Sequence, residues 1–469
     1  MTTSAAAELS RVPQTVHARA HSLGRIPFAF GRRFFVGLIV GLAWLAPAWW
    51  SPLFIVAMFF WDGLLLAACF WDLYRLPAAR QIAVSRIWHA RPALGVTSRV
   101  DIQISTDGPL VLRMHAVDEI PFSLAAEPPE LVATVPAGGA TLLSYPILPR
   151  KRGETRVGRI FLRYQSGLQL AERRGVAETG QVVRVLPNIE QARNQTLNLI
   201  RSRQVEIDRR RYRQRGMGRE IESLREYNEG DEFRNISWTA TARRHRLITR
   251  VFQMERSQIV WLVLDAGRLL RAQVREPGNP LRLSKLDHAV NAALSLAQVT
   301  LHCGDRVGLL AYGSRTQQSL LPAREPHQVR HFADALAEVH AENSEPDHAR
   351  AVRTLLSMQK RRSLIVWITD FAETATVPEV IDYAMQMTPR HLVIFATMNQ
   401  PELVALAAAM PASPEEMYRH AAALEICQRR ESLLGRLRQH GVLAFEWMPW
   451  GLSTVLVNQY LEVKERNWL

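Results

Sequence analysis

The chain has 469 residues, of which 48% are hydrophobic and 22% are charged, and its 58 Lys and Arg outnumber 44 Asp and Glu to give a net charge of +14. This composition excludes wholesale disorder, because disordered chains lack the apolar residues that pack a core. The three cysteines, Cys69, Cys303 and Cys427, are far apart and form no CxxC pair, which excludes a disulfide framework and a zinc cluster.

The first apolar segment, residues 34–71, carries a single charge, Asp62, and is interrupted by Pro47 and Pro52. One membrane span needs about 20 apolar residues. We therefore predict that residues 31–76 form a transmembrane hairpin of two helices. Asp62 lies in mid-span, where a carboxylate is costly and suggests function. With no second charge to form a relay, we favour protonation or packing against a neighbouring helix over transport.

Arginines flank this segment on both sides and are absent from its turn; they are Arg25, Arg32 and Arg33 before it and Arg75, Arg80 and Arg86 after it. The positive-inside rule then places both termini and the soluble domains in the cytoplasm, with the lipid bilayer of the inner membrane as a partner. Residues 1–30 lack periodicity and are expected to form a flexible cytoplasmic arm.

Residues 77–187 are rich in short alternating apolar segments. Val100, Ile102 and Ile104 alternate with polar neighbours, and Gly and Pro residues separate the segments. This spacing predicts an antiparallel β-sandwich. Residues 188–257 form an arginine-rich connector, which lipid headgroups would attract more simply than nucleic acid would, so we expect no nucleic acid partner.

Continuous apolar runs mark residues 258–469 as an α/β domain. The runs are 259–264, 307–311, 364–368 and 392–396, with helical stretches between them and a helical insert at about 401–440. Such runs are typical of parallel strands covered on both faces, and they predict a doubly wound sheet. Ligands of such sheets bind at the carboxyl ends of the strands.

Two of the predicted strands end in aspartate, Asp265 and Asp370. In this respect the domain resembles the von Willebrand factor A fold, whose family motif for magnesium is Asp-x-Ser-x-Ser, a Thr and a later Asp. Asp265 and Asp370 match the two aspartates. The serine places hold Gly267 and Leu269, and no Thr stands in the expected loop, where Ser344 or Asp347 would have to replace it. Magnesium needs near-octahedral oxygen ligation. We therefore favour a structural role for both aspartates over a degenerate metal site, and expect no cofactor.

A second pattern runs from Ser223 to Arg250. Its most distinctive residues are Arg225, Glu226, Tyr227, Gly230, Asp231, Arg234, Trp238 and Arg243. This segment resembles the signature of the bacterial domain-of-unknown-function family fifty-eight, and the plan of the chain from about residue 30 onward is similar to that family. The arginines are bidentate donors, the acids are acceptors, and the aromatic rings can pack against the sheet. The segment is either an ion-paired brace between domains or a docking face, and both roles can coexist.

The resemblance implies association with MoxR-type AAA+ ATPases. The chain lacks the GxxxxGK[ST] phosphate loop and so should not hydrolyse nucleotide itself. Cys303 next to His302 gives no catalytic geometry. We therefore predict a non-enzymatic, membrane-anchored adaptor whose A-type domain docks a cytoplasmic partner. The alternative is a magnesium-dependent A-type adhesion module.

Overall fold

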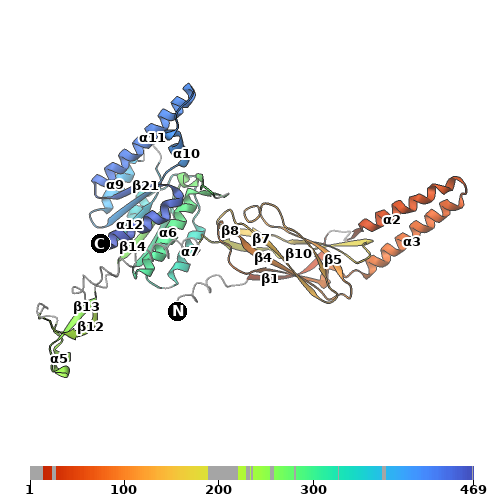
Figure 1. Ribbon diagram of the computed structural model, residues 1–469, viewed down its shortest axis with the longest axis horizontal. Coiled ribbons are helices and arrows are strands. Elements are labelled where there is room, and N and C mark those ends of the chain that lie inside the picture. Colours follow the sequence, from red (N-terminus) through yellow and green to blue (C-terminus); the bar gives the residue numbers. More distant parts are fainter. Residues whose placement is uncertain are drawn as a thin grey trace. The chain divides into compact units, whose positions relative to one another are not determined.

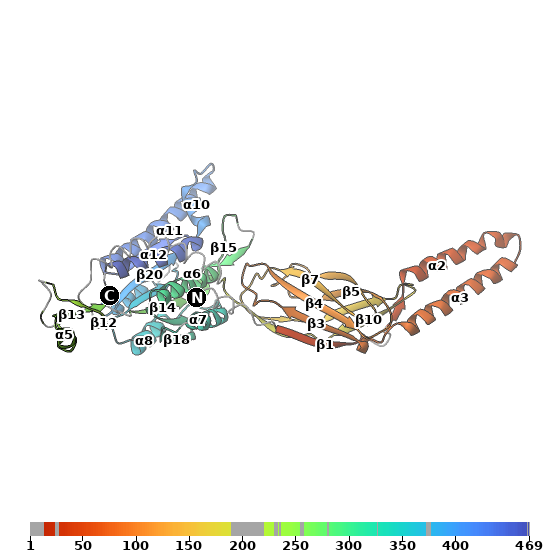
Figure 2. The same ribbon diagram turned by 60° about the horizontal axis from the view of Figure 1, so that its bottom comes forward.

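The computed structural model describes residues 14–23, 28–188, 220–228, 233, 236–253, 258–278, 281–325, 327–371, 377–466 and 468. The chain forms two compact units, residues 1–186 and residues 187–469 (Figure 1). The first unit contains a large sheet and a pair of helices. The second contains a sheet covered by helices and a smaller pair of strands (Figure 2).

The first unit is built on a nine-stranded antiparallel sheet with the order β6-β5-β9-β10-β1-β3-β4-β7, in which β2 also pairs with β10. Its strands are β1 (Gln14–Ser22), β2 (Phe28–Phe30), β3 (Ile82–Trp88), β4 (Ser98–Thr106), β5 (Leu112–Asp118), β6 (Glu130–Val135), β7 (Ala140–Ile147), β9 (Ile160–Gln165) and β10 (Ala171–Ala177). The remaining strands of this unit, β8 (Gly153–Val157) and β11 (Gln181–Val185), pair with each other.

This sheet curls until its two edge strands come close together. The Thr141 hydroxyl of β7 donates a hydrogen bond to the Thr134 carbonyl of β6 at 3.0 Å. Alternate side chains such as Ile102, Met114 and Leu162 are buried, because every second residue of a curled strand points inward. The predicted sandwich of two sheets is therefore wrong, since one sheet nearly closes into a barrel.

The expected arm at residues 1–30 also needs correction at β1 and β2, whereas residues 1–13 and 24–27 lie outside the described residues. Strand β1 pairs with β3 on one side and with β10 on the other. Within β1, Val16, Ala18 and Ala20 are more buried than the polar residues between them. This short alternation of small apolar residues is enough to add a strand, because the neighbouring strands supply most of the apolar surface.

The helices of the first unit are α2 (Arg32–Leu42) and α3 (Leu53–Arg75), which pack side by side (Figure 1). Between and after them lie the 3₁₀ turns η1 (Ala43–Leu45), η2 (Pro47–Trp49) and η3 (Ala79–Gln81). In the described part of the chain, only α3 is long and apolar enough to cross a membrane. At 1.5 Å per residue α2 measures about 16 Å, which is short of a hydrocarbon core of about 30 Å. The predicted hairpin of two spans is therefore wrong.

Helix α2 contacts α3 through its glycines. The Trp61 indole of α3 donates to the Gly37 carbonyl at 3.0 Å. A Cβ atom on Gly41 would lie 2.7 Å from Asp62 Oδ1, so the Asp62 carboxylate lies directly against α2. This contact favours the packing role for Asp62.

Most of the predicted arginine-rich connector, residues 189–219, lies outside the described residues. After it, the second unit contains the antiparallel pair β12 (Glu220–Glu226) and β13 (Ile248–Gln253), with helix α5 (Trp238–Arg244) between them. Its main sheet has six strands in the order β18-β17-β14-β19-β20-β21. These strands are β14 (Ile259–Asp265), β17 (Arg306–Tyr312), β18 (Thr316–Ala323), β19 (Leu364–Ile368), β20 (Leu392–Met398) and β21 (Leu443–Trp447). All are parallel except β18, which is antiparallel to β17 at one edge.

Helices cover both faces of the six-stranded sheet. They are α6 (Lys285–His302), α7 (Gln328–Glu338), α8 (His348–Met358), α9 (Val377–Met387), α10 (Pro401–Ala408), α11 (Pro414–Gln439) and α12 (Leu452–Glu465). Along β14, Leu262 and Leu264 pack into a core with α6, α7 and α12, whereas Trp261 and Val263 pack against α8, α9 and the end of α11. The short elements β15 (Gln273–Arg275), β16 (Arg282–Ser284), η5 (Arg268–Arg271) and η6 (Pro449–Gly451) complete the unit.

The predicted fold class, with its β-sandwich and its hairpin of two spans, is therefore wrong, although the helix-covered parallel sheet predicted for residues 258–469 does form. The largest sheet is a nearly closed antiparallel one, and a single helix of the described chain can span a membrane. The metal-binding arrangement of the von Willebrand factor A motif is also not formed, because Lys285 and Arg430 contact Asp370, the last aspartate of that motif.

Candidate functional site

The candidate site lies where β14 and β19 end. These neighbouring parallel strands bring Asp265 to the same edge of the sheet as Thr369 and Asp370. Asp265 and Asp370 are only 2% and 6% exposed. Two buried carboxylates at one edge need partners, because an unpaired buried charge is strongly unfavourable.

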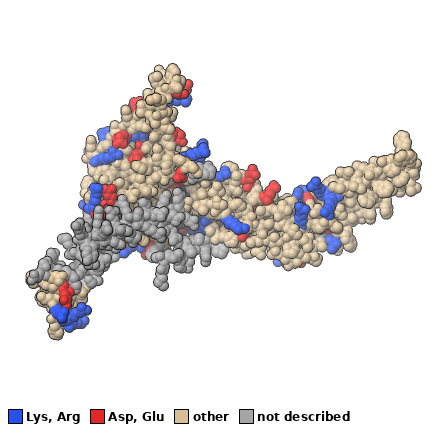
Figure 3. All heavy atoms as spheres, viewed as in Figure 1, with Lys and Arg blue, Asp and Glu red and all other residues tan. Residues whose placement is uncertain are grey.

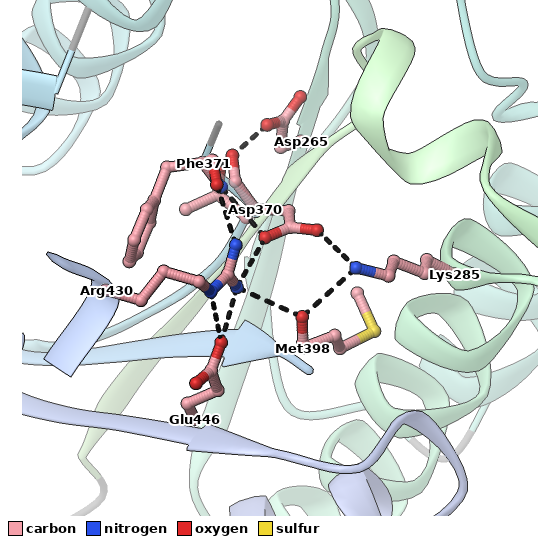
Figure 4. Close-up of polar contacts among 8 residues, drawn as sticks. Asp265, Lys285, Asp370, Phe371, Met398, Arg430 and Glu446 are labelled. Atoms are coloured by element: carbon pink, nitrogen blue, oxygen red, sulfur yellow. Dashed lines mark hydrogen bonds and ion pairs between the residues drawn. The ribbon is translucent and has the colours of Figure 1, made fainter. Parts of the chain in front are cut away.

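Asp370 contacts two cations from distant parts of the chain (Figure 4). The Lys285 ammonium donates to Asp370 Oδ2 at 2.6 Å and to the Met398 carbonyl at 3.1 Å. The Arg430 guanidinium donates to Asp370 Oδ1 at 2.9 Å. Both oxygens of this carboxylate are therefore occupied by ion pairs.

Arg430 connects helix α11 to three strands. Its Nε donates to Glu446 Oε1 of β21 at 2.6 Å, and its NH1 donates to the Phe371 carbonyl at 2.8 Å. The guanidinium also lies 4.7 Å from the centre of the Phe371 ring, within range of a cation–π contact. Burial acts to lower the pKa of Arg430, but Asp370 and Glu446 outweigh it and raise the pKa above its ordinary value.

Asp265 has neutral hydrogen-bond donors instead of cations. The Thr369 hydroxyl donates to Asp265 Oδ2 at 2.6 Å, and the Gly267 backbone N–H donates to Oδ1 at 2.7 Å. Burial raises the pKa of Asp265 to about 7, although both hydrogen bonds act to lower it. This carboxyl group therefore changes its charge near neutral pH.

Local sequence explains why these side chains meet. The Ser284 hydroxyl accepts from the Asp287 backbone N–H at 3.1 Å and caps α6, so Lys285 is the first residue of that helix. A Cβ atom on Gly267 would lie 2.5 Å from Pro346 Cδ. A serine at position 267, as the A-type motif requires, does not fit without displacing Pro346.

The loop at 342–347 has other roles than metal binding. Asp347 accepts from the Arg350 backbone N–H at 2.8 Å and caps α8. Ser344 donates to Glu342 at 3.0 Å. The backbone N–H of Ser314 and further donors lower the pKa of Glu342 to about 2. Neither proposed replacement ligand, Ser344 or Asp347, is directed to Asp370 by these contacts.

The arrangement therefore does not fit a magnesium ion. The Lys285 ammonium is in direct contact with one of the two predicted ligands, Asp370, and Leu269 contributes no oxygen. The described residues include no group of three His, Cys, Asp or Glu side chains that could hold a metal. What the site does chemically is join α6 and α11 to the ends of β19, β20 and β21.

The signature segment lies in the β12–α5–β13 region. Gly230, Asp231 and Arg234 lie outside the described residues, and Arg225 is part of β12. Glu226 accepts from Arg246 at 2.9 Å, and the Tyr227 ring lies 5.8 Å from that of Phe233.

Helix α5 carries the last two signature residues that the structure describes. Trp238, its first residue, is 66% exposed, and Arg243 lies in its exposed last turn. The expectation that Trp238 helps to pack this segment against the sheet stays a prediction.

Sequence reasoning did not identify Lys285, Arg430 or Glu446. One signal was present for Lys285, which is one of only four lysines in an arginine-rich chain. Arg430 lies 60 residues from Asp370 and is one of many arginines on α11, so no local pattern distinguishes it.

Comparison with known proteins gives one family match. The model of the family described as "Protein of unknown function DUF58" matches residues 223–409. Uncharacterized protein YeaD of Bacillus subtilis (strain 168) is 26% identical over 125 residues, which are 26% of this chain and 27% of that protein. The chain thus aligns with about a quarter of the length of this relative.

Similarity to solved structures is low. The conserved hypothetical protein BatB from Bacteroides thetaiotaomicron has a TM-score of 0.28 at 13% identity, covering 44% of this chain and 99% of that one. The ASH/PapD-like domain of human CEP192 has a TM-score of 0.15 at 12% identity, covering 20% of this chain and 77% of that one. Neither score establishes a shared fold. The family match confirms the resemblance found in the signature: residues 223–409 of this chain match the model of the DUF58 family.

Proposed function

We propose that the chain is a non-enzymatic adaptor that is attached to a membrane and docks a cytoplasmic AAA+ ATPase of the MoxR type. The type of ATPase is the one that the family resemblance implies. In this proposal the ATPase supplies the nucleotide chemistry, and this chain supplies position and recognition.

Helix α3 supports the membrane attachment. Its 23 residues have a mean hydropathy of 2.2 in their most apolar window, and only 6% of that window is buried. An exposed apolar surface of this size is unfavourable in water and marks a site of interaction, and a helix of 23 residues has the length that crosses the hydrocarbon core of a bilayer. No arginine lies between Arg33 and Arg75, whereas arginines flank this segment on both sides. By the positive-inside rule, this distribution favours a cytoplasmic location for the rest of the chain, at the inner membrane.

The docking proposal rests on an apolar tip, which is formed by α10, the connection at residues 409–413 and the first part of α11. Met410, Met417 and Tyr418 are 96%, 59% and 81% exposed. The far part of α11 is buried through Leu434 and Leu437, so the tip projects from the sheet (Figures 1 and 2). Exposed methionine and aromatic side chains are enriched in protein interfaces.

The tip is held in shape by its own contacts. The His420 ring nitrogen Nδ1 lies 3.0 Å from the Leu406 carbonyl, and Ser413 caps α11 by accepting from the Glu416 backbone N–H at 3.2 Å. Glu416 in turn accepts from the Ala412 backbone N–H at 2.8 Å. A preordered apolar surface loses little conformational entropy when a partner binds.

The test is co-purification of the full chain from native membranes under nucleotide-trapping conditions. We expect a MoxR-type AAA+ ATPase to co-purify with the natural chain. The double substitution Met410→Asp and Tyr418→Asp should lower its recovery about tenfold or more, because central apolar contacts carry most of the energy of an interface.

The matched control is Leu321→Asp, which changes a side chain that is 68% exposed in strand β18 of the same unit. It should leave recovery of the ATPase unchanged. Absence of any AAA+ ATPase from the natural preparation contradicts the partner. Equal loss in the tip variant and the control contradicts the surface.

A further inference from the structure

A cluster of arginines lies where the helix pair meets the barrel-like sheet. We call Arg32, Arg33, Arg75 and Arg173 the arginine collar. Arg32 and Arg33 begin α2, and Arg75 ends the antiparallel α3, so these three lie at the same end of the helix pair. Figure 3 shows Lys and Arg gathered at this junction, whereas the helices beyond it present neither.

The turn between β9 and β10 holds the collar together. Arg33 NH1 donates to the Gly167 carbonyl at 3.4 Å, and Arg173 NH2 donates to the Leu73 carbonyl at 3.0 Å. The backbone N–H of Gly31 donates to the Leu170 carbonyl at 2.7 Å. Both helix ends are thereby fixed to one short segment of the sheet.

The acidic side chains in the collar region are buried and engaged. Asp72 is 1% exposed and accepts from the Ser166 hydroxyl at 2.5 Å and from the backbone N–H groups of Leu170 and Ala171 at 3.2 and 3.1 Å. Glu172 is 6% exposed and accepts from the Gln165 amide at 2.8 Å. Arg32, Arg33 and Arg75 are exposed. The collar therefore presents positive charge to its surroundings.

Aromatic residues lie at the same level. Trp71 and Tyr74, in the last turns of α3, are 63% and 85% exposed. Tryptophan and tyrosine accumulate at the level of lipid headgroups, between the apolar core of a bilayer and water. Toward the end of α3, an apolar surface is followed by exposed aromatic rings and then by exposed arginines. This order matches the layers of a bilayer, which are the hydrocarbon core, the headgroup level and the charged surface.

From this order we propose that the arginine collar binds the phosphate groups of anionic phospholipids and so fixes the depth and tilt of the barrel-like sheet at the membrane surface. The inference rests on the proposed attachment through α3. Beyond that attachment, the arginine collar makes the chain select lipids by the charge of their headgroup. A basic residue near an anionic bilayer surface contributes about fivefold in affinity.

The experiment uses the full chain, purified in detergent and reconstituted into nanodiscs that contain phosphatidylcholine and phosphatidylglycerol. Native mass spectrometry then counts the lipids that remain bound when the nanodisc is removed. We expect a preference for phosphatidylglycerol that falls about tenfold or more in the triple variant Arg32→Gln, Arg33→Gln and Arg75→Gln.

Two further variants serve as controls. The triple Arg→Lys variant at the same positions should keep most of the preference, which separates loss of charge from loss of fold. The triple variant Arg99→Gln, Arg156→Gln and Arg159→Gln removes the same charge away from the collar. Arg99 lies near Asp101, which pairs with Ile87, and Arg159 precedes Ile160, which pairs with Ala177; both pairs are at the end of the sheet opposite the 165–172 turn. Arg156 is three residues before Arg159 in β8. This variant should retain the preference.

Several results would overturn the proposal. They are equal binding of both lipids by the natural chain, an equal loss in the distant triple variant, and displacement of bound lipid by inorganic phosphate, which would mark a site for free anions. Flotation with liposomes tests the attachment separately. A natural chain that fails to float with either lipid contradicts the membrane attachment itself, whereas flotation without preference contradicts the collar alone.

Discussion

Asp370 is buried between two cations, and this balance of charge determines what the site can do. Removing charges from water costs several kcal/mol per ion, and the cost is offset only where every charge has a partner. Lys285 and Arg430 are matched by Asp370 and Glu446, and the main-chain carbonyls of Met398 and Phe371 accept the remaining hydrogen bonds. The charges of these four side chains thus balance, and their hydrogen bonds are made within the chain.

Replacing Asp370 by Asn should destabilise the second unit by about 3–5 kcal/mol, because it leaves two buried cations with one carboxylate. Asp382→Asn, on the exposed face of α9, is the matched control and should have little effect. Hydrogen exchange of peptides from β19 and α11 in the full chain measures the difference. Equal exchange in the two variants would show that the ion pairs do not hold α11 in place.

The raised pKa of Asp265 predicts a pH dependence with a definite sign. Its pKa rises from 3.8 in the unfolded chain to about 7 in the folded chain, so the fold favours the protonated form. That contribution to stability is complete below about pH 4 and is lost as the pH rises through about 7. The Asp265→Asn variant does not lose stability in this way, because asparagine does not titrate.

Relative to the natural chain, Asp265→Asn should therefore become more stable as the pH rises from about 4 to about 7. Hydrogen exchange of the β14 peptide, corrected for the intrinsic effect of pH, gives the comparison. Parallel pH profiles for the two chains would mean that Asp265 is already ionised at acidic pH.

Among the elements of the first unit, one carboxylate accepts most of the hydrogen bonds that join the end of α3 to the sheet. Asp72 accepts three hydrogen bonds from the segment 166–171, and the Cys69 thiol donates to the Leu170 carbonyl at 3.4 Å. Hydrogen bonds to a charged group contribute about 1.5–3 kcal/mol each. Under the proposed membrane attachment, motion of α3 is coupled to the sheet through these hydrogen bonds.

Asp72→Asn should free the β9–β10 turn, because the amide offers one acceptor oxygen in place of two. We expect hydrogen exchange at residues 166–173 to rise by about tenfold or more. Asp107→Asn, in an exposed loop of the same unit, should leave that exchange unchanged. Unchanged exchange in Asp72→Asn would mean that other contacts hold the turn.

The elements differ in how far the sequence could predict them. The apolar runs around Leu262 and Val366 form parallel strands because each run is buried on both faces, and that property is visible in the residues themselves. Strand β1 could not be predicted, because His17 and Arg19 alternate with small apolar residues, and this short segment alone is as typical of a flexible terminus as of a strand. Closure of the sheet could not be predicted because it depends on the combined curvature of strands that are far apart in the sequence, which no local pattern encodes.

The candidate site shows the same limit. The aspartates could be placed at the carboxyl ends of two strands, because strand ends can be read from apolar runs. Their partners could not, since Lys285 lies 85 residues from Asp370 and Arg430 lies 60 residues away. Only the packing of α6 and α11 on the sheet brings these cations to the carboxylate.

In the molecule as a whole, the features proposed for attachment and for recognition lie in different units. The first unit carries the apolar helix α3, and the second carries the DUF58 match and the apolar tip. The net charge of +14 is consistent with residence beside an anionic membrane surface. Under the proposed function, one unit sets where the chain is and the other sets what it binds.

The central claim is that the apolar tip contacts a MoxR-type AAA+ ATPase, and photocrosslinking in living cells tests it most directly. A photoreactive phenylalanine analogue would replace Met410, which is 96% exposed, and in a separate chain Leu321, which is 68% exposed. The account predicts a crosslink from position 410 to the ATPase and none from position 321. A chain that crosslinks to the ATPase from neither position, while remaining in the membrane fraction, would contradict it.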